Sequence, residues 1–225
     1  MSKNLNRRKF CKHSSLVILA SLFPNFAYSN SSSNKIIKGN VLVNGKNFNQ
    51  NSNLNLEDVT VIETNNTLAL LKNDQNGFLI RPNTKIKFFK NKIRELVKGS
   101  VHGIFGKQSN ELKIKTPRGT IGVRGTAAYI EYEQKFDRTY VCNCYGETAV
   151  YDLNNKELKV LSNKYHTPLV INNNNRIDNS PYNYPLNHFD DNINSIENFL
   201  GRKPKWELPE GKMIFFAPDK EKINI

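Results

Sequence analysis

Two cysteines stand two residues apart in the segment TYVCNCYGETAVYD, and they are the side chains best suited to chemistry in this sequence. In a β-strand, residues i and i+2 point to the same side, so Cys142, Cys144 and Tyr140 should share one face. His166 or His102 could join the two thiols, and a set of two thiolates and an imidazole suits zinc or copper. The C-x-C spacing with a distant histidine is a weaker signal than paired C-x-x-C motifs.

Three interpretations of Cys142 and Cys144 are therefore open. The sequence favours two buried thiols, because free cysteine is among the most buried residue types. A disulfide ranks second, since an exported protein meets an oxidising compartment, although a bond between such close same-face positions would be strained. A metal site formed by Cys142, Cys144 and His166 ranks third.

Motifs of catalysis are missing from the sequence. It contains neither G-x-S-x-G nor H-E-x-x-H, and no nucleophile motif stands near a histidine. Asp190 and Asp191 are adjacent on an expected helix, so we expect them to point in different directions and to be solvated. The sequence predicts a protein that is not an enzyme and that carries no cofactor.

A glycine-rich segment, TPRGTIGVRGTAAYIEY, spans residues 116–132. It lacks the Lys-Ser/Thr end of a phosphate-binding loop, and β-branched residues follow it where such a loop would lead into a helix. We therefore expect a crowded central strand, with its glycines marking a bulge or a close backbone approach. Arg124 should point into a tightly packed polar place and bind loop carbonyls or one carboxylate. A ligand-binding role for Arg124 is the alternative.

The elements that must position these residues are short β-strands. From Ile36 to Ile171, runs of four to eight alternating residues are separated by turn signals such as Asn44-Gly45. This pattern predicts an all-β domain, solenoid-like or sandwich-like, over residues 36–171.

The last segment, 172–225, reads as a C-terminal extension. It begins with an irregular asparagine-rich arm and continues into one short helix that ends at Gly201. The apolar positions of that helix have helical spacing: Phe189, Ile193, Ile196 and Leu200. Trp206, Phe215 and Phe216 should pack on the β domain, and an exposed aromatic patch for a partner is the alternative.

Residues 1–29 have the layout of a signal peptide, with a basic front, a short apolar run and a cleavage site near Ser29. Arg7, Arg8, Phe10 and Lys12 match the twin-arginine export motif, and a general secretory signal is the alternative. Residues 30–35 should form a polar linker. The expected localisation is periplasmic or secreted, and the sequence predicts no membrane span in the mature chain.

The formal net charge is +13, of which the five lysines and arginines of the first 29 residues contribute five, leaving +8. The remaining basic residues are scattered among acidic residues and asparagines. They form no basic run with interleaved aromatic residues, so the sequence predicts no nucleic-acid partner.

The segments around the cysteines and glycines resemble the FecR domain, a periplasmic β-rich module. The hallmark T-P-x-x-x-x-G-V-R-G-T stands at residues 116–126, and the earlier strand pattern G-x-V-x-V-N-G stands at residues 39–45. A looser match covers residues 54–64, and Pro82-Asn83-Thr84 fits the P-N-T element. The resemblance covers about residues 36–171.

What the resemblance implies is an all-β module that binds an unknown protein partner or senses a ligand without catalysis. Regulators of that family place a sigma-factor-binding domain and a membrane helix ahead of the module. An export signal stands in their place in this sequence, so their transmembrane regulatory activity is not expected here.

Overall fold

The computed structural model describes residues 34–90, 93–107, 110–182 and 184–218. The expected signal peptide 1–29, with Arg7, Arg8, Phe10 and Lys12, lies outside the described residues, as does the linker up to residue 33. The prediction of an all-β fold is confirmed. The described strands are β1 Asn34–Lys38, β2 Val41–Val43, β3 Lys46–Phe48, β4 Val59–Glu63, β5 Ala69–Asn73, β6 Asn76–Ile80, β7 Lys85–Phe89, β8 Ile93–Ile104, β9 Leu112–Thr116, β10 Gly119–Val123, β11 Ala127–Glu133, β12 Arg138–Tyr151, β13 Glu157–Asn163, β14 Thr167–Ile171 and β15 Ile177–Asn179.

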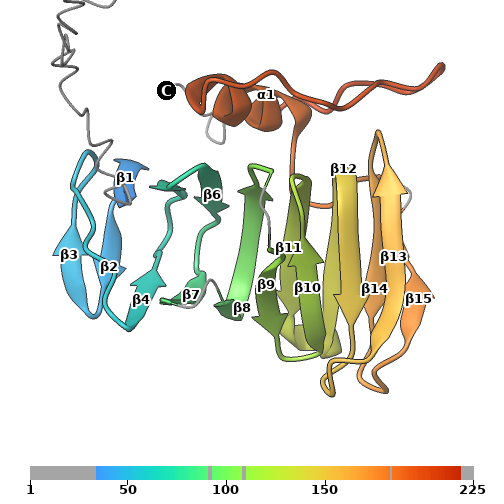
Figure 1. Cartoon of the computed structure of the whole chain (residues 1–225), viewed down its shortest axis with the longest axis horizontal. Coiled ribbons are helices and arrows are strands. Elements are labelled where there is room, and N and C mark those ends of the chain that lie inside the picture. Colours follow the sequence, from blue (N-terminus) through green and yellow to red (C-terminus); the bar gives the residue numbers. More distant parts are fainter. Residues whose placement is uncertain (1–33, 91–92, 108–109, 183, 219–225) are drawn as a thin grey trace, which may run out of the picture. The chain divides into compact units, whose positions relative to one another are not determined.

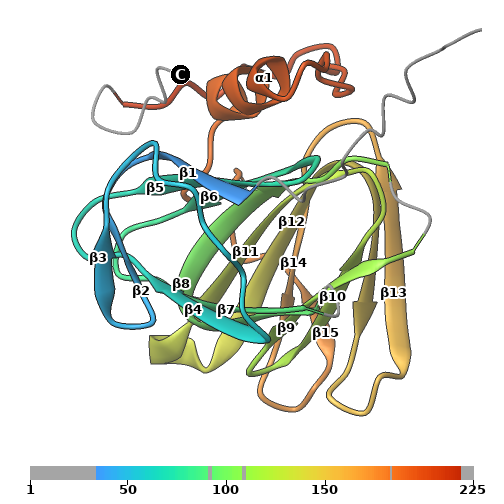
Figure 2. The same ribbon diagram turned by 60° about the vertical axis from the view of Figure 1, so that its left-hand side comes forward.

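These strands form two sheets around a common core, and on the left of Figure 2 strands β1, β5 and β6 of one sheet lie above β4 and β7 of the other. Sheet A has the order β1-β5-β6-β8-β11-β12-β14-β15, and sheet B has the order β3-β2-β4-β7-β8-β9-β10-β12-β13. Neighbouring strands are antiparallel except for β8 and β9, which run parallel. Of the two predicted arrangements, solenoid-like and sandwich-like, the structure has the sandwich-like one.

Two long strands, β8 and β12, belong to both sheets. The first half of β8 pairs with β7 and β9 in sheet B, and its second half pairs with β6 and β11 in sheet A. β12 runs the other way, from β11 and β14 in sheet A to β10 and β13 in sheet B. Each strand changes sheets at a glycine with positive φ, Gly99 at +81° and Gly146 at +83°. Only glycine adopts such angles without steric cost, so these residues allow the two bends.

Side chains of sheet A alternate between two apolar clusters. Val141 of β12, for example, points into the core between the two sheets, whereas Tyr140, Cys142 and Cys144 point to the outer face. The same alternation holds in β5, β6, β11 and β14. Both faces of sheet A are therefore buried.

The C-terminal extension covers the outer face. Its helix α1, Asp190–Phe199, lies over the layer that contains β1, β5 and β6, and Ile193 and Ile196 are fully buried in the outer cluster (Figures 1 and 2). The predicted helix is confirmed, and Gly201 follows it with a φ of +72°. The arm contains one short strand that was not expected, β15, which pairs with β14. Strand β1 also begins two residues earlier than the expected domain boundary.

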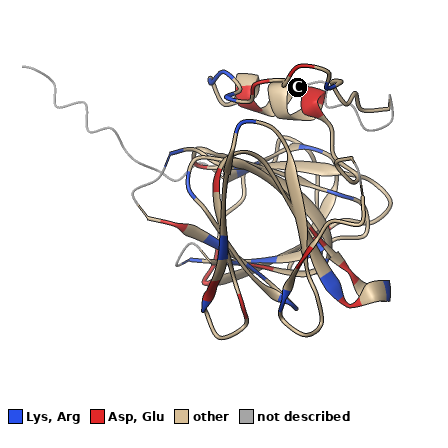
Figure 3. Cartoon of the chain, turned by 90° about the vertical axis from the view of Figure 1, so that its right-hand side faces the viewer, with Lys and Arg blue, Asp and Glu red and all other residues tan. Residues whose placement is uncertain are grey.

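The aromatic residues of the extension differ in their packing. Trp206 packs against the outer cluster and Phe215 is half-buried, but Phe216 is 68% exposed, so its expected packing on the β domain is wrong. Basic and acidic residues are interspersed along the ribbons in Figure 3. Within the described ranges, no helix has the length and apolar character needed to cross a membrane.

Gly99→Ala should reduce the free energy of unfolding by about 3 kcal/mol, measured by denaturant titration. A Cβ at this position would lie 2.7 Å from the Thr84 Cα, and Thr84 is fixed by hydrogen bonds with Ser100. Gly45→Ala is the matched control, because Gly45 has a similar φ of +77° but open space around it, so we expect a loss of only about 1 kcal/mol. Equal losses in the two variants would contradict the steric argument.

Candidate metal centre

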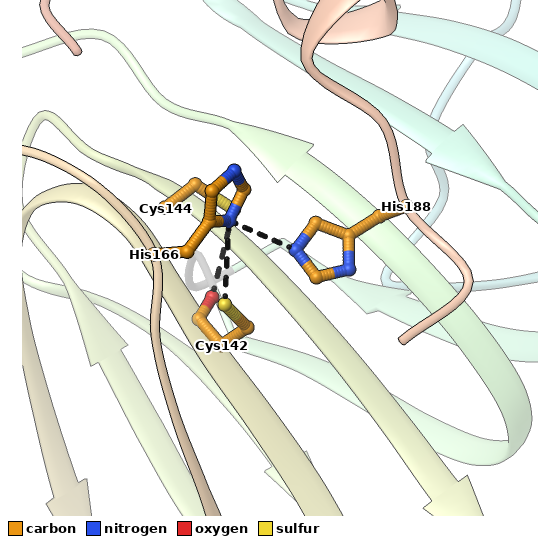
Figure 4. Close-up of side chains that lie close together, drawn as sticks. All are labelled: Cys142, Cys144, His166 and His188. Atoms are coloured by element: carbon orange, nitrogen blue, oxygen red, sulfur yellow. Dashed lines mark hydrogen bonds between the residues drawn. The ribbon is translucent and has the colours of Figure 1, made fainter. Parts of the chain in front are cut away.

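Four side chains with soft or borderline donor atoms meet on the outer face of sheet A (Figure 4). Cys142 and Cys144 come from β12, His166 from the turn between β13 and β14, and His188 from the segment directly before α1. One donor atom from each lies within 4.8 Å of the others. The structure thus joins the three predicted residues and adds His188.

His166 presents its Nδ1 atom to the centre of this group. Its Nε2 atom lies 2.7 Å from Asp190 Oδ1 and donates to that carboxylate. The Nδ1 atom is 3.5 Å from Cys142 Sγ and 3.2 Å from His188 Nε2. Asp190 is itself held by the backbone N–H of Phe215 and by the Tyr165 hydroxyl. A carboxylate that fixes the far nitrogen of an imidazole is the usual outer partner of a metal-binding histidine.

His188 is oriented in the same manner by a different partner. Its Nδ1 atom donates to the Leu186 carbonyl at 2.6 Å, which leaves the Nε2 lone pair facing His166. Its ring also stacks on Tyr129, with centroids 4.6 Å apart and planes at 10°. Two imidazole nitrogens whose opposite N–H groups are both in use therefore face each other at 3.2 Å. Such a pair repels unless a proton or a cation lies between the two nitrogens.

The distances fit a tetrahedral cation. With zinc bond lengths of about 2.3 Å to sulfur and about 2.05 Å to nitrogen, tetrahedral angles place two nitrogens about 3.3 Å apart and a nitrogen and a sulfur about 3.6 Å apart. The observed separations are 3.2 Å between His166 Nδ1 and His188 Nε2 and 3.5 Å between His166 Nδ1 and Cys142 Sγ. The two separations that involve His166 Nδ1 thus match those around one ion, and the four donor atoms all lie within 4.8 Å of one another.

His102 lies beside this group and contacts Cys144. Its Nε2 atom is 3.5 Å from Cys144 Sγ, and its ring meets that of His188 at a centroid distance of 5.2 Å. Burial, together with the charges of His188 and His166, holds the pKa of His102 well below its ordinary value. A neutral His102 can donate one hydrogen bond to the Cys144 sulfur and so help to position it.

Burial and mutual contacts shift the pKa values within the group. Burial lowers the pKa of His166, but its hydrogen bonds with Asp190 and Cys142 outweigh that effect and raise the pKa to about 9. Burial raises the pKa of the Cys142 thiol, yet contacts with Cys144, His188 and His166 place it well below its usual range. Burial keeps the pKa of Cys144 well above its usual range. One negative charge on Cys142 is therefore favoured in this buried group.

Cys142, His166 and Asp190 also form the thiol–imidazole–carboxylate series of cysteine nucleophiles. A substrate could not reach the Cys142 sulfur, which argues against nucleophilic catalysis by this residue. Cys142 is fully buried, and His188 and Cys144 occupy the space beside its sulfur where a substrate would have to approach. The same atoms serve better as ligands of a small ion.

The burial predicted for Cys142 and Cys144 is confirmed, and so is the face that they share with Tyr140. Both are free thiols in the structure. The expectation of a solvated Asp190 is wrong, because this carboxylate is fully buried against His166. His188 was missed as a donor, since it lies 22 residues beyond His166 and no motif links the two. Its one sequence signal is its place two residues before the buried start of α1.

The expected setting of Arg124 is wrong. The segment 116–132 is not one strand, because the chain turns between β10 in sheet B and β11 in sheet A at Gly125, whose φ is +67°. Arg124 lies at this turn, its side chain is 56% exposed, and it forms an ion pair with Glu111 at 3.4 Å. The space over Gly122 is filled by the carboxyl group of Glu111 and not by another backbone. Arg124 is not part of the cysteine–histidine group. The prediction that Arg124 binds one carboxylate is confirmed by its ion pair with Glu111.

Comparisons with known proteins give structural likenesses at low sequence identity. No family model matches the chain, and no curated protein matches it. A crystal structure of a putative anti-sigma factor from Parabacteroides distasonis is similar with a TM-score of 0.48 and 15% identity, covering 73% of this chain and 86% of the other. A second crystal structure of a putative anti-sigma factor from the same organism has a TM-score of 0.47 and 14% identity, with coverages of 70% and 82%. Membership of the FecR family stays a prediction.

Arg124→Ala should change the free energy of unfolding by less than about 1 kcal/mol, because exposed ion pairs contribute little. Glu111 keeps Lys113 and the Tyr151 hydroxyl as partners when Arg124 is removed. Glu111→Ala should cost more, since this carboxyl group is only 10% exposed and fills the space over Gly122. Denaturant titration measures both losses, and a larger loss in Arg124→Ala would contradict the roles assigned to the two residues.

Cys142 and Cys144 should react slowly with iodoacetamide in the folded protein, because neither has exposed surface. Both should react after denaturation without a reductant, which peptide mass spectrometry can follow separately from Cys11. Labelling that requires a reductant would show that the two residues form a disulfide in the purified protein.

Proposed function

We propose that this chain is a metal-binding module that holds one zinc-like cation through Cys142, Cys144, His166 and His188. One observation carries the proposal: the two imidazole nitrogens that face each other at 3.2 Å beside two thiols, with their opposite nitrogens held by Asp190 and Leu186. A cation between the nitrogens would take the place of a proton there and form two ligand bonds.

The donor set favours zinc over harder cations. Two sulfurs and two imidazoles in a tetrahedral arrangement suit zinc, whereas magnesium and calcium select oxygen ligands. Two thiolates also neutralise the charge of a divalent ion, which lowers the cost of burying it in the apolar outer cluster. A bound cation would draw electron density from the His166 ring. The Asp190 carboxylate, which accepts a hydrogen bond from that ring, would stabilise the resulting positive charge.

A role in folding and recognition follows more readily from this site than catalysis. A tetrahedral ion with four protein ligands has no position left for a substrate or a water molecule, which is the arrangement of structural zinc sites. This supports a module without enzymatic activity, as the sequence predicts.

The proposed setting is the one that the sequence indicates: an exported, FecR-like binding or sensing module of the periplasm. Its protein partner is unknown. The alternation of basic and acidic residues in Figure 3 favours a partner other than nucleic acid. Among the described residues, Met213 and Phe216 of the extension are the most exposed large apolar side chains, at 77% and 68%, and they are available to a protein partner.

The direct test is metal binding by the purified protein. We expect one zinc ion per chain by elemental analysis after dialysis against buffered zinc. Replacement by cobalt(II) should give the intense visible absorption of a tetrahedral ion and a thiolate-to-cobalt band in the near ultraviolet. A stoichiometry near zero, or the pale spectrum of an octahedral ion, would contradict the proposal.

Two variants separate ligands from their supports. Cys142→Ser removes one of the two thiolate ligands. The thiolate-to-cobalt band should therefore lose the contribution of this sulfur, and zinc should bind more weakly than in the second variant. Asp190→Asn keeps the shape of the side chain and should weaken zinc binding about 10- to 100-fold, as loss of an outer partner does. The matched control is Asp178→Asn, an exposed acidic residue of β15, which should leave the affinity unchanged.

A further inference from the structure

The donors of the proposed centre come from two parts of the chain. Cys142, Cys144 and His166 belong to sheet A and its connecting turn, whereas His188 belongs to the C-terminal extension that lies over the sheet. Resting on the proposed metal site, we propose that the cation acts as a clasp that holds the covering part of the extension, residues 186–218, on the outer face of sheet A.

Helix α1 depends on such docking for its stability. It has only ten residues, and an isolated helix of that length is unstable in water. Its N-cap, Phe189, offers no side-chain hydrogen bond. The two carboxylates of its first turn bind elsewhere, Asp190 to His166 and Asp191 to the backbone N–H of Ala217. The helix should therefore lose its structure whenever the extension leaves the sheet.

Other contacts also hold the extension on the β domain without the proposed cation: Asp190 pairs with His166, Asn187 donates to Glu131, and Glu207 pairs with Lys164. At the far end of α1, Glu197 accepts a hydrogen bond from the Tyr145 hydroxyl and pairs with Arg202, which donates to the Gln75 carbonyl at 2.7 Å. Near its start, the Leu186 N–H donates to the Tyr140 hydroxyl. Burial of Ile193 and Ile196 adds the apolar contribution. The proposed cation would add to these contacts near the start of the extension, through His188.

Binding of the cation and docking of the extension on the sheet should each favour the other, because the two equilibria are linked. With the extension on the sheet, the cation has four ligands; with the extension released, it has three. The ion therefore binds the closed form more tightly, and it favours closure by the same factor. Couplings of this kind are commonly about 5- to 150-fold, so we expect the cation to reduce the released population by about 10- to 100-fold.

Hydrogen exchange of the full chain, read by mass spectrometry with saturating zinc or with a chelator, tests the clasp. Zinc should slow exchange of the α1 amides, Asp190–Phe199, by about 10- to 100-fold. Strands β2 to β4 of sheet B are the internal reference and should change little, because release of the extension leaves their hydrogen bonds intact.

Two variants sharpen the test. In His188→Gln the three sheet donors remain, so zinc should still bind, more weakly, but should no longer slow exchange of α1. In Glu197→Gln the far attachment is weakened, so exchange of α1 should rise in both conditions while the ratio between them stays that of the unmodified protein.

The outcomes distinguish this inference from the proposed function. Zinc that binds one per chain without slowing exchange of α1, or that slows it equally in His188→Gln, overturns the clasp and leaves the metal site standing. Failure to bind zinc overturns both. If His188→Gln does not fold, His188→Phe replaces it, since a phenyl ring can keep the stacking on Tyr129 and offers no donor atom.

Discussion

Sheet A must be kept from water on both faces, and the other features of this protein follow from that constraint. Apolar side chains alternate between an inner cluster, shared with sheet B, and an outer cluster of similar burial. Sheet B cannot cover both faces, so the outer one requires a second layer. A C-terminal extension with one short helix provides it, and its burial explains why strands such as β6 and β12 are apolar on both sides.

Against this apolar face, a group of thiols and imidazoles is unusual. Polar groups removed from water are costly unless each has a partner. Asp190 and the Leu186 carbonyl satisfy the outer nitrogens of His166 and His188, and His102 supports Cys144. The inner donor atoms face one another, and that is where a single cation would satisfy all four. The four-residue group and the covering layer therefore depend on each other, because the layer carries His188, one of the four donors.

The sequence predicted the strands well, because alternation and turn pairs such as Asn44-Gly45 are local signals, and this pair joins β2 to β3 as expected. It also predicted the shared face of Cys142 and Cys144. It failed where the answer depends on contacts between distant segments. The glycines of residues 116–132 looked like one crowded strand, whereas Gly125 turns the chain from one sheet to the other. Asp190 looked solvated because its burial is set by His166, and His188 gave no sign of its role because the arm that brings it to the sheet has no regular pattern.

The passage of β8 and β12 through both sheets has a mechanical consequence. In a sandwich whose sheets are joined only by loops, the two layers can slide and separate with the loss of side-chain packing alone. Here two continuous backbones cross from layer to layer at Gly99 and Gly146, and their hydrogen bonds lie in both sheets. Shear between the layers would therefore have to break backbone pairing as well as packing. The two sheets form one cooperative unit, whereas residues 186–218 contact it without strand pairing, so their release would leave the hydrogen bonds between strands intact.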